Sequence, residues 1–218
     1  MITGIIGGGF AALVVCFFAY ARITGHLQFY VVPTAGCEPG IPRGAHVLAS
    51  DWIAPKRFDI ICYMHDLGDR KEVWLQRVCG LPGDTITMRA GRLSVNGQEA
   101  DAAFSLKHRY RAHYSMKNRL VKQGDLHPDD HFPISSDSIA VFIIDASAER
   151  FGLKRLQGFI PDSVFHAPGW QEGELPETIV PEGHWFMLGD NRNASVDSRY
   201  IGFVAQSQFI GTVFRVIK

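Results

Sequence analysis

The chain has 218 residues, of which 20% are charged, and its 22 basic and 22 acidic side chains give a formal net charge of +0. A chain of this length buries one good core, or one core with an inserted satellite, and we expect the second arrangement. Lys and Arg are scattered along the chain without a basic footprint and phosphate-binding glycine motifs are absent, so we expect no nucleic-acid partner.

The first predicted element is an apolar helix. The stretch 2–20 carries no charged side chain and is rich in Ile, Ala, Val and Phe, which is about the length that crosses a hydrocarbon core. We therefore predict a transmembrane anchor over 1–24, with the lipid bilayer as a partner. A cleavable secretory signal is the main alternative, but the first residues supply no basic side chain; a buried soluble helix is the other. Arg22 follows the span and, by the positive-inside rule, weakly favours a cytoplasmic body.

The four cysteines do not form a disulfide framework. Cys16 lies in the predicted span, whereas Cys37, Cys62 and Cys79 allow three single pairings that each leave one thiol over. The sequence does not decide whether any of these disulfides forms. No group of Cys and His has the spacing of a metal site, so we expect neither a metal nor a cofactor.

A series of short strands follows the predicted anchor. Turns rich in Pro and Gly separate them, and the predicted strands cover 26–32, 43–52, 58–64, 72–79 and 85–88. Two hairpins are expected next, because the turn dipeptides Ala90-Gly91 and Asn96-Gly97 enclose a short alternating strand at 93–95. These strands predict a β core over 25–97.

The stretch 98–177 differs in composition from both flanks. It is rich in His, Asp, Ser and Pro around one apolar run at 139–144, and its periodicity is weak. We predict an inserted subdomain here, with a short helix within 145–156. The β core resumes over 178–218, with strands at 178–180 and 209–217. The predicted fold class is therefore mostly β, with an inserted subdomain and one N-terminal transmembrane helix.

A dense polar loop lies between two apolar runs in the stretch 185–204. Two acids and two arginines of this loop can pair with one another, namely Asp190, Arg192, Asp197 and Arg199. Four further side chains can bond its irregular backbone, namely Asn191, Asn193, Ser195 and Ser198. A solvated surface turn is the plain alternative, but surface turns seldom need two acid–arginine pairs between buried strands. We expect the loop to buttress a site.

Three segments, in this order, match sequence boxes of one known family. They read Pro-Thr-Ala-Gly-Cys-Glu-Pro at 33–39, Gln-Arg-Val-Cys-Gly-Leu-Pro-Gly-Asp at 76–84 and Gly-Asp-Asn-Arg-Asn-Ala-Ser-Val-Asp-Ser-Arg at 189–199. They resemble P-S-x-S-M-x-P, in an altered copy, K-R-V-x-G-x-P-G-D and G-D-N-R-x-x-S-x-D-S-R of the signal peptidase I family. The resemblance covers the anchor, 32–87 and 179–211, while the insert is identified only by its position.

The resemblance implies a location and an activity. Members of this family are tethered to the bacterial inner membrane by a helix, hold their β-domain on the periplasmic side, and remove signal peptides from secreted preproteins with a serine and lysine dyad. This implied topology outweighs the single cation Arg22, since family members carry a basic residue at the same place after the span.

Both dyad positions are substituted in this chain. The alignment places Gly36 at the serine nucleophile and Gln76 at the general-base lysine, with Thr34 at a serine whose hydroxyl helps to form the oxyanion hole. Glycine has no oxygen to attack a carbonyl, and an amide has no basic lone pair near neutral pH. We therefore predict that neither half of the dyad can act.

The supporting residues of the family are retained. In the family, the equivalent of Ser195 hydrogen-bonds the lysine, and the equivalents of Asp197 and Arg199 hold the site together by ion pairing. We expect Ser195 to bond Gln76 here instead. The segment resembles a preserved scaffold around a vacated centre.

Neighbouring residues are poor substitutes for the dyad. Lys71 lies on the opposite face of its strand from Gln76, because side chains alternate along a strand. Cys37 is a better nucleophile by chemistry, but it is one residue out of register and needs a base or a lowered pKa. The plain alternative for Cys37 is a small packed side chain that replaces a methionine.

Three functional hypotheses follow. The leading one is a catalytically inactive or impaired signal-peptidase-like membrane protein that binds signal-peptide-bearing preproteins, or a similar peptide segment, in an extended, strand-adding mode. The second is an active signal peptidase, or a pilin-processing relative, that uses Cys37 or another unforeseen nucleophile. The third is an assembly subunit of a secretion apparatus, with a membrane or secretion-system partner.

Overall fold

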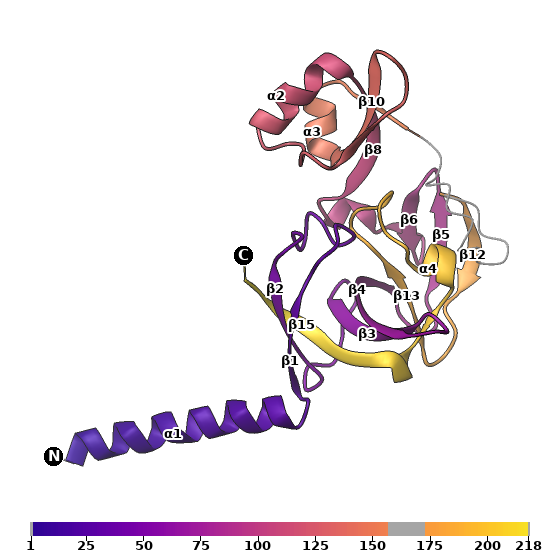
Figure 1. Ribbon diagram of the computed structural model, residues 1–218. Helices are drawn as coiled ribbons and strands as arrows, with labels where there is room; N and C mark the ends of the chain where they lie inside the picture. The colour runs from indigo at the N-terminus through magenta and orange to yellow at the C-terminus, as the bar shows by residue number, and fades with distance from the viewer. Residues whose placement is uncertain (1, 157–172, 218) are drawn as a thin grey trace.

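The computed structural model describes residues 2–156 and 173–217, with side chains from Ala12 onward. The chain begins with the helix α1 (Ile2–Ile23), which extends away from the β-strands (Figure 1). Among the residues whose side chains are described, no helix is long and apolar enough to cross a membrane. The side chains of 1–11, about half of the predicted anchor, lie outside these residues.

The largest sheet contains seven antiparallel strands in the order β1–β2–β15–β3–β4–β13–β14. The strands are β1 (Leu27–Val31), β2 (His46–Ser50), β3 (Ile60–Asp66), β4 (Lys71–Gly80), β13 (His184–Leu188), β14 (Val204–Ala205) and β15 (Phe209–Ile217). The C-terminal strand β15 lies between β2 and β3 (Figure 1), so the two ends of the chain build one sheet.

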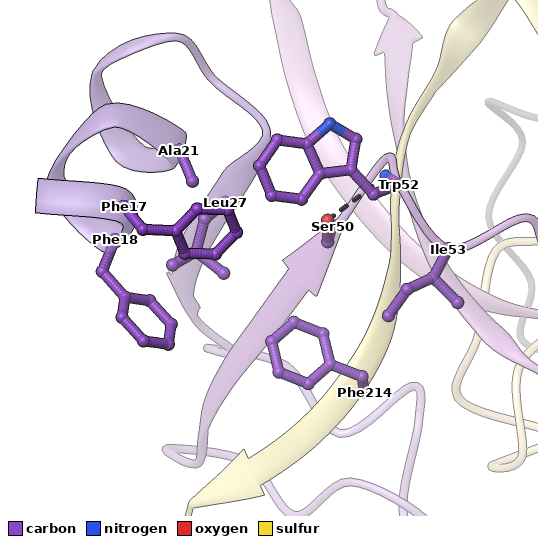
Figure 2. Close-up of a pocket in the computed structure, with 8 residues that line it drawn as sticks. All are labelled: Phe17, Phe18, Ala21, Leu27, Ser50, Trp52, Ile53 and Phe214. Atoms are coloured by element: carbon purple, nitrogen blue, oxygen red, sulfur yellow. Dashed lines mark hydrogen bonds between the residues drawn. The ribbon is translucent and has the colours of Figure 1, made fainter. Parts of the chain in front are cut away.

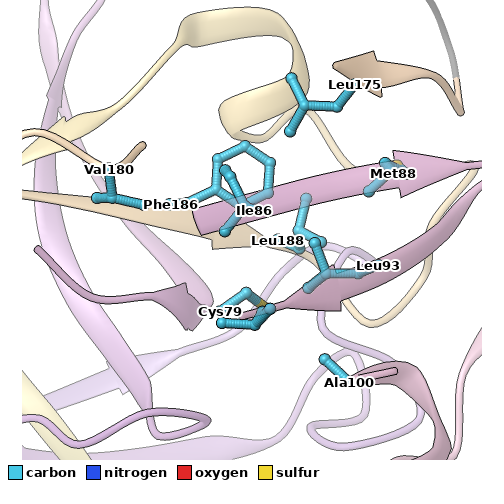
Figure 3. Close-up of a cluster of buried hydrophobic side chains, with 10 residues drawn as sticks. Cys79, Ile86, Met88, Leu93, Ala100, Leu175, Val180, Phe186 and Leu188 are labelled. Atoms are coloured by element: carbon cyan, nitrogen blue, oxygen red, sulfur yellow. The ribbon is translucent and has the colours of Figure 1, made fainter. Parts of the chain in front are cut away.

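A second sheet contains four strands in the order β12–β5–β6–β7. They are β5 (Thr85–Arg89), β6 (Arg92–Val95), β7 (Gln98–Glu99) and β12 (Leu175–Ile179). Both predicted hairpin turns are confirmed, since Ala90, Gly91, Asn96 and Gly97 all have positive φ. Apolar side chains of β5 and β6 pack against those of β13 in a buried cluster that includes Ile86, Leu93 and Phe186 (Figure 3). The core strand predicted at 178–180 is part of β12 in this sheet, whereas β7 and the first three residues of β12 lie within the predicted insert.

A third sheet has its own apolar core and is drawn far from α1 in Figure 1. Its strand order is β11–β8–β10–β9. The elements are β8 (Lys107–His113), β9 (His131–Pro133), β10 (Ser138–Ile144), β11 (Lys154–Arg155), α2 (Lys117–Lys122) and α3 (Asp145–Arg150). The part of the predicted insert at 157–172 lies outside the described residues.

The fold class is mostly β, as the sequence predicts. The helix expected within 145–156 is confirmed as α3, but α2 and the one-turn helix α4 (Ser198–Ile201) were not predicted. Both have weak patterns, since α2 buries only Leu120 and α4 buries only Ser198. Three 3₁₀ turns complete the described elements, namely η1 (Asp101–Ala103), η2 (Tyr114–Met116) and η3 (Gln206–Gln208).

All four cysteines are free thiols, so none of the three disulfide pairings forms. Cys37, Cys62 and Cys79 are buried, and burial raises the pKa of each thiol to about 12. These cysteines therefore act as small apolar side chains in the cores.

Candidate functional site

The turn between β1 and β2 places Gly36 directly against the polar loop. The carbonyl oxygen of Gly36 accepts a hydrogen bond of 3.0 Å from the backbone N–H of Asn191. A Cβ atom built on Gly36 would lie 3.6 Å from Ser195 Oγ and 3.7 Å from the carbonyl oxygen of Ala194. These are ordinary van der Waals distances and Gly36 does not have a positive φ, so the backbone accepts a side chain at this position.

Gln76 lies buried in β4, with 3% of its surface exposed, and both ends of its amide are bonded. The hydroxyl of Tyr63 donates to Gln76 Oε1 at 2.8 Å, and Gln76 Nε2 donates to the carbonyl oxygen of Val196. In the described part of the chain no hydrogen bond joins Gln76 to Ser195, so the expected bond between these two side chains is replaced by a bond to the next residue of the loop. Gly36 thus lies beside Ser195 of the loop, and Gln76 bonds the next residue of the loop, Val196.

Neither Tyr63 nor Lys71 provides a base at the position of Gln76. Burial raises the pKa of Tyr63 above its ordinary value, which keeps the hydroxyl protonated and donating to Gln76. Lys71 is exposed at the beginning of β4, where its Nζ lies 3.9 Å from a carboxylate oxygen of Asp66. An amide held in this way provides position and polarity but does not take a proton.

Cys37 is a packed thiol rather than an activated one. Its Sγ donates to the carbonyl oxygen of Leu75 at 3.0 Å, and its side chain belongs to a buried cluster with Val32, Ile41 and Val47. Burial raises the pKa of the Cys37 thiol to about 12, with the charge of Asp190 adding to this effect. A thiolate is the nucleophilic form of cysteine, so Cys37 has the opposite of the environment that nucleophilic cysteines require.

The ion pair between Asp197 and Arg199 forms as predicted. Asp197 is fully buried, and its two carboxylate oxygens accept bonds of 2.7 and 2.8 Å from Nε and Nη2 of Arg199. The same carboxylate accepts a bond of 3.0 Å from the backbone N–H of Gly189, while Arg199 Nη2 donates to the carbonyl oxygen of Arg192 at 2.7 Å. These contacts tie the two ends of the loop together.

The other two charged residues of the loop pair outside it, which corrects the prediction of pairing across the loop. Asp190 binds Arg77 of β4, with 2.7 Å between Arg77 Nε and Asp190 Oδ1. Arg192 binds Asp101 of η1, with 2.9 Å between Arg192 Nη1 and Asp101 Oδ2. The loop is therefore fixed to two other elements, and the side chains of Asp190 and Arg192 are nearly fully buried.

The polar residues expected to bond the loop backbone have mixed roles. Asn193 Oδ1 accepts from the backbone N–H of Arg109 at 3.0 Å, and Ser198 Oγ accepts from that of Met187 at 2.8 Å. The side-chain amide of Asn191 is fully buried and has no hydrogen-bond partner among the described residues. Thr34 lies two residues before Gly36 in the same turn and is exposed.

Two further contributors are not among the residues predicted from the sequence, namely Tyr63 and Lys107. Tyr63 lies opposite Trp74 in the ladder between β3 and β4 and reaches Gln76. Its position in a predicted strand was the available signal, because residues two apart share a face. Lys107 joins the insert to the loop, and no sequence pattern distinguishes it from the scattered surface lysines.

An apolar cavity of about 210 Å³ lies where α1 meets the largest sheet (Figure 2). Its lining comes from α1, β1, β2, the turn that follows β2, and β15, and consists of Phe17, Phe18, Ala21, Leu27, Ser50, Trp52, Ile53 and Phe214. The Trp52 ring lies 5.5 Å from that of Phe17 and stacks on His26 at 4.9 Å. Trp52 therefore contacts the helix from the turn that follows β2.

Comparison with known proteins identifies relatives. The family model described as signal peptidase, peptidase S26 matches residues 6–217. The chain is 29% identical over 188 residues to signal peptidase I of Bacillus caldolyticus. This alignment covers 84% of this chain and 75% of that protein. It is 26% identical over 182 residues to signal peptidase I of Buchnera aphidicola subsp. Acyrthosiphon pisum, covering 74% and 54% respectively. The chain thus spans about half the length of the Buchnera relatives that it matches.

A solved structure is also similar to the chain. It is the crystal structure of a signal peptidase I from Enterococcus faecalis V583, with 24% identity and a TM-score of 0.38. The match covers 74% of this chain and 98% of that one.

Proposed function

Because the chain belongs to the signal peptidase, peptidase S26, family, we propose that it is a signal-peptidase-like protein that binds signal-peptide segments of preproteins without cleaving them. The observation that carries this proposal is that Gly36 lies beside Ser195, while Gln76 is hydrogen-bonded to Val196, the next residue of the loop. The supporting side chains are present, but neither Gly36 nor Gln76 supplies a nucleophile or a base.

The absence of cleavage follows from the chemistry of these two residues. Gly36 offers only backbone atoms, and the Gln76 amide is engaged by Tyr63 and Val196. Loss of a nucleophile or of its base typically lowers turnover by a factor on the order of a million. Any residual rate of cleavage is therefore expected to come only from binding of the peptide and polarisation of its carbonyl group.

Retention of binding follows from the intact frame around the centre. Asp197 and Arg199 hold the loop closed, and the glycines at 36 and 189 keep the loop and the turn in close contact. Strand β1, which leads into the turn, is an edge strand of the seven-stranded sheet. An edge strand has backbone groups free to pair with an added extended peptide.

We further propose that the α1 end of the molecule lies at the bacterial inner membrane, with the β-domain on the periplasmic side. Large apolar side chains are exposed along α1, including Leu13, Val15 and Ile23 at 71%, 67% and 84%. Trp52 and Phe214 are exposed beside them and line the apolar cavity. An apolar surface bordered by an amphipathic tryptophan suits the boundary between lipid and water.

The test of the proposed function is a binding measurement on the full chain. The probe is a fluorescein-labelled synthetic peptide with a basic start, an apolar middle and a small-residue end, and its anisotropy is recorded while its length is followed by mass spectrometry. We expect saturable binding with no shortened product. A matched peptide with two aspartates in the apolar middle serves as the control; equal binding of both peptides, or of neither, contradicts the proposal.

A second candidate function is an assembly subunit of a secretion apparatus. It is favoured by large apolar side chains exposed on the insert, namely Tyr114, Phe132 and Ile134. Co-purification of a stable membrane partner, combined with failure to bind the signal peptide, would select this function. The alternative of an active peptidase that uses Cys37 is disfavoured by the burial of its thiol.

A further inference from the structure

One residue of the inserted subdomain, Lys107, contacts both segments that form the candidate site. Its backbone N–H donates to the carbonyl oxygen of Asp190 at 3.0 Å, and its carbonyl oxygen accepts from the N–H of Arg192 at 2.9 Å. Its Nζ donates to Glu38 Oε2 at 2.6 Å and to Asp130 Oδ2 at 2.7 Å. Lys107 thus pairs with the polar loop through its backbone and with the turn at 33–42 through its side chain.

The side chain of Lys107 belongs to a largely buried network of four charges. Arg43 completes it, because its guanidinium binds Glu38, with 2.9 Å from Nε to Oε1, and also Asp130. The turn supplies Glu38 and Arg43, and the insert supplies Lys107 and Asp130, so each of the two units contributes one acid and one base. Only 8% of the Lys107 side chain and 12% of the Glu38 side chain are exposed.

The network is balanced, and its members depend on one another. Burial alone would raise the pKa of Glu38, but hydrogen bonds from Arg43 and Lys107 outweigh this effect and hold the pKa at about 2. A buried charge that loses its partner is strongly unfavourable, whereas removal of both partners is much less so. Loss of Lys107 would leave two carboxylates to share one guanidinium.

The turn has little freedom to move without disturbing the site. Glu38 is two residues from Gly36, whose carbonyl is bonded to Asn191 of the loop. A Cβ atom on Gly40 would approach Asp190 Oδ2 to 2.5 Å, so turn and loop are in close contact there as well. A displacement of the Glu38 carboxylate would therefore also displace the backbone at Gly36.

We propose that Lys107 is a positioning residue through which the inserted subdomain holds the turn at 33–42 against the loop at 189–199, and so controls the shape of the peptide site. The statement about the peptide rests on the proposed function, whereas the statement about the turn does not. The insert then acts as a support for the site and not only as an appended surface.

The test compares four full-length proteins by hydrogen–deuterium exchange. They are the unchanged protein, Lys107→Met, the charge-balanced variant Lys107→Met with Glu38→Gln, and the control Lys154→Met, which alters an exposed lysine of the same subdomain. The reporting amides are those of Ile41 and Asn191, which bond the carbonyl oxygens of Cys37 and Gly36. The reference amides are those of β10 in the core of the insert.

We expect Lys107→Met to accelerate exchange at Ile41 and Asn191 at least about tenfold, with the β10 amides unchanged, and the charge-balanced variant to restore most of the protection. The peptide probe should bind Lys107→Met at least about tenfold more weakly. Unchanged exchange at the reporting amides, or equal acceleration in β10, would overturn the inference, since the second result indicates a role in stability alone.

Failure of the proposed function is separable from failure of this inference. If the unchanged protein does not bind the peptide, the proposed function fails, and the exchange comparison still decides the role of Lys107. If the peptide binds the unchanged protein and Lys107→Met equally well, the control of the site by the insert is contradicted while the proposed function stands. Should Lys107→Met not fold, Glu38→Gln removes the other end of the same contact and is compared in its place.

Discussion

The hydroxyl of Tyr63 donates a 2.8 Å hydrogen bond to the side-chain oxygen of Gln76, and this bond fixes the orientation of a buried amide. With its oxygen held by Tyr63, the amide directs its nitrogen to the carbonyl of Val196. Both partners can accept a hydrogen bond, since a tyrosine hydroxyl donates or accepts. The surroundings of Gln76 therefore offer two hydrogen-bond acceptors to a lysine amine placed at this position.

Two glycines of the turn should respond in opposite ways to an added methyl group. Gly36→Ala should leave the free energy of unfolding within about 0.5 kcal/mol of its original value, because its Cβ meets only ordinary contacts. Gly40→Ala should lower it by about 1–3 kcal/mol, because the Cβ would lie 2.5 Å from Asp190 Oδ2 and 3.0 Å from Arg77 Nη2. Urea unfolding of both variants measures this, and equal stability of the two contradicts the packing described.

Asp197 should be essential to the fold of the loop. Asp197→Asn leaves the buried guanidinium of Arg199 without a charged partner, and the free energy of unfolding should fall by about 3–5 kcal/mol. Asp69→Asn provides a control, since the ion pair of Asp69 with Arg70 is well exposed and should contribute little. A small effect of Asp197→Asn in thermal unfolding would show that the pair does not support the loop.

Cys37 should resist alkylation in the folded protein. A buried thiol with a pKa of about 12 carries almost no thiolate at pH 8. Treatment with iodoacetamide, followed by peptide mass spectrometry, should show no label at Cys37 in the folded protein, and label there only after unfolding in urea. Rapid labelling of Cys37 in the folded protein would support the active-thiol alternative.

The contribution of Glu38 to stability should depend on pH. Its pKa is lowered from 4.5 to about 2 in the folded protein, because hydrogen bonds from Arg43 and Lys107 outweigh the effect of burial. The ionised group therefore stabilises the fold above about pH 4.5, and this stabilisation is lost as the pH falls toward 2. The difference in unfolding free energy between the unchanged protein and Glu38→Gln should be full at pH 7 and shrink between pH 4.5 and 2. A difference that stays constant over this range would exclude the ionised form as its source.

Local patterns allowed much of the fold to be predicted. The turn dipeptides at 90–91 and 96–97 identified two hairpins because they favour positive φ. The polar composition of 189–199 identified a loop that is indeed held by buried charges. The seven-stranded order, with β15 between β2 and β3, could not be predicted, since no local pattern shows which distant strands pair.

The ion-pair partners of the charged loop residues are harder to predict from the sequence than the loop itself. Asp190 and Arg192 were expected to pair within the loop, yet they bind Arg77 and Asp101, which are far away in sequence. Spacing along the chain reports only local partners, and Asp197 with Arg199 is the pair for which it was sufficient. The same limit applies to Lys107, because its four partners come from two distant segments and from the insert itself.

Cleavage of a signal peptide by restored variants tests the central claim most directly. The unchanged protein, Gly36→Ser, Gln76→Lys and the double variant are each incubated with the same peptide, together with Gly36→Ala/Gln76→Lys as a control that adds a side chain without a hydroxyl. We expect product only from the double variant, at a rate at least about a thousandfold above the unchanged protein, which is part of the roughly millionfold that a nucleophile and its base supply. Robust cleavage by the unchanged protein that survives Gly36→Ala, or no cleavage by a correctly folded double variant, would contradict a preserved scaffold around a vacated centre.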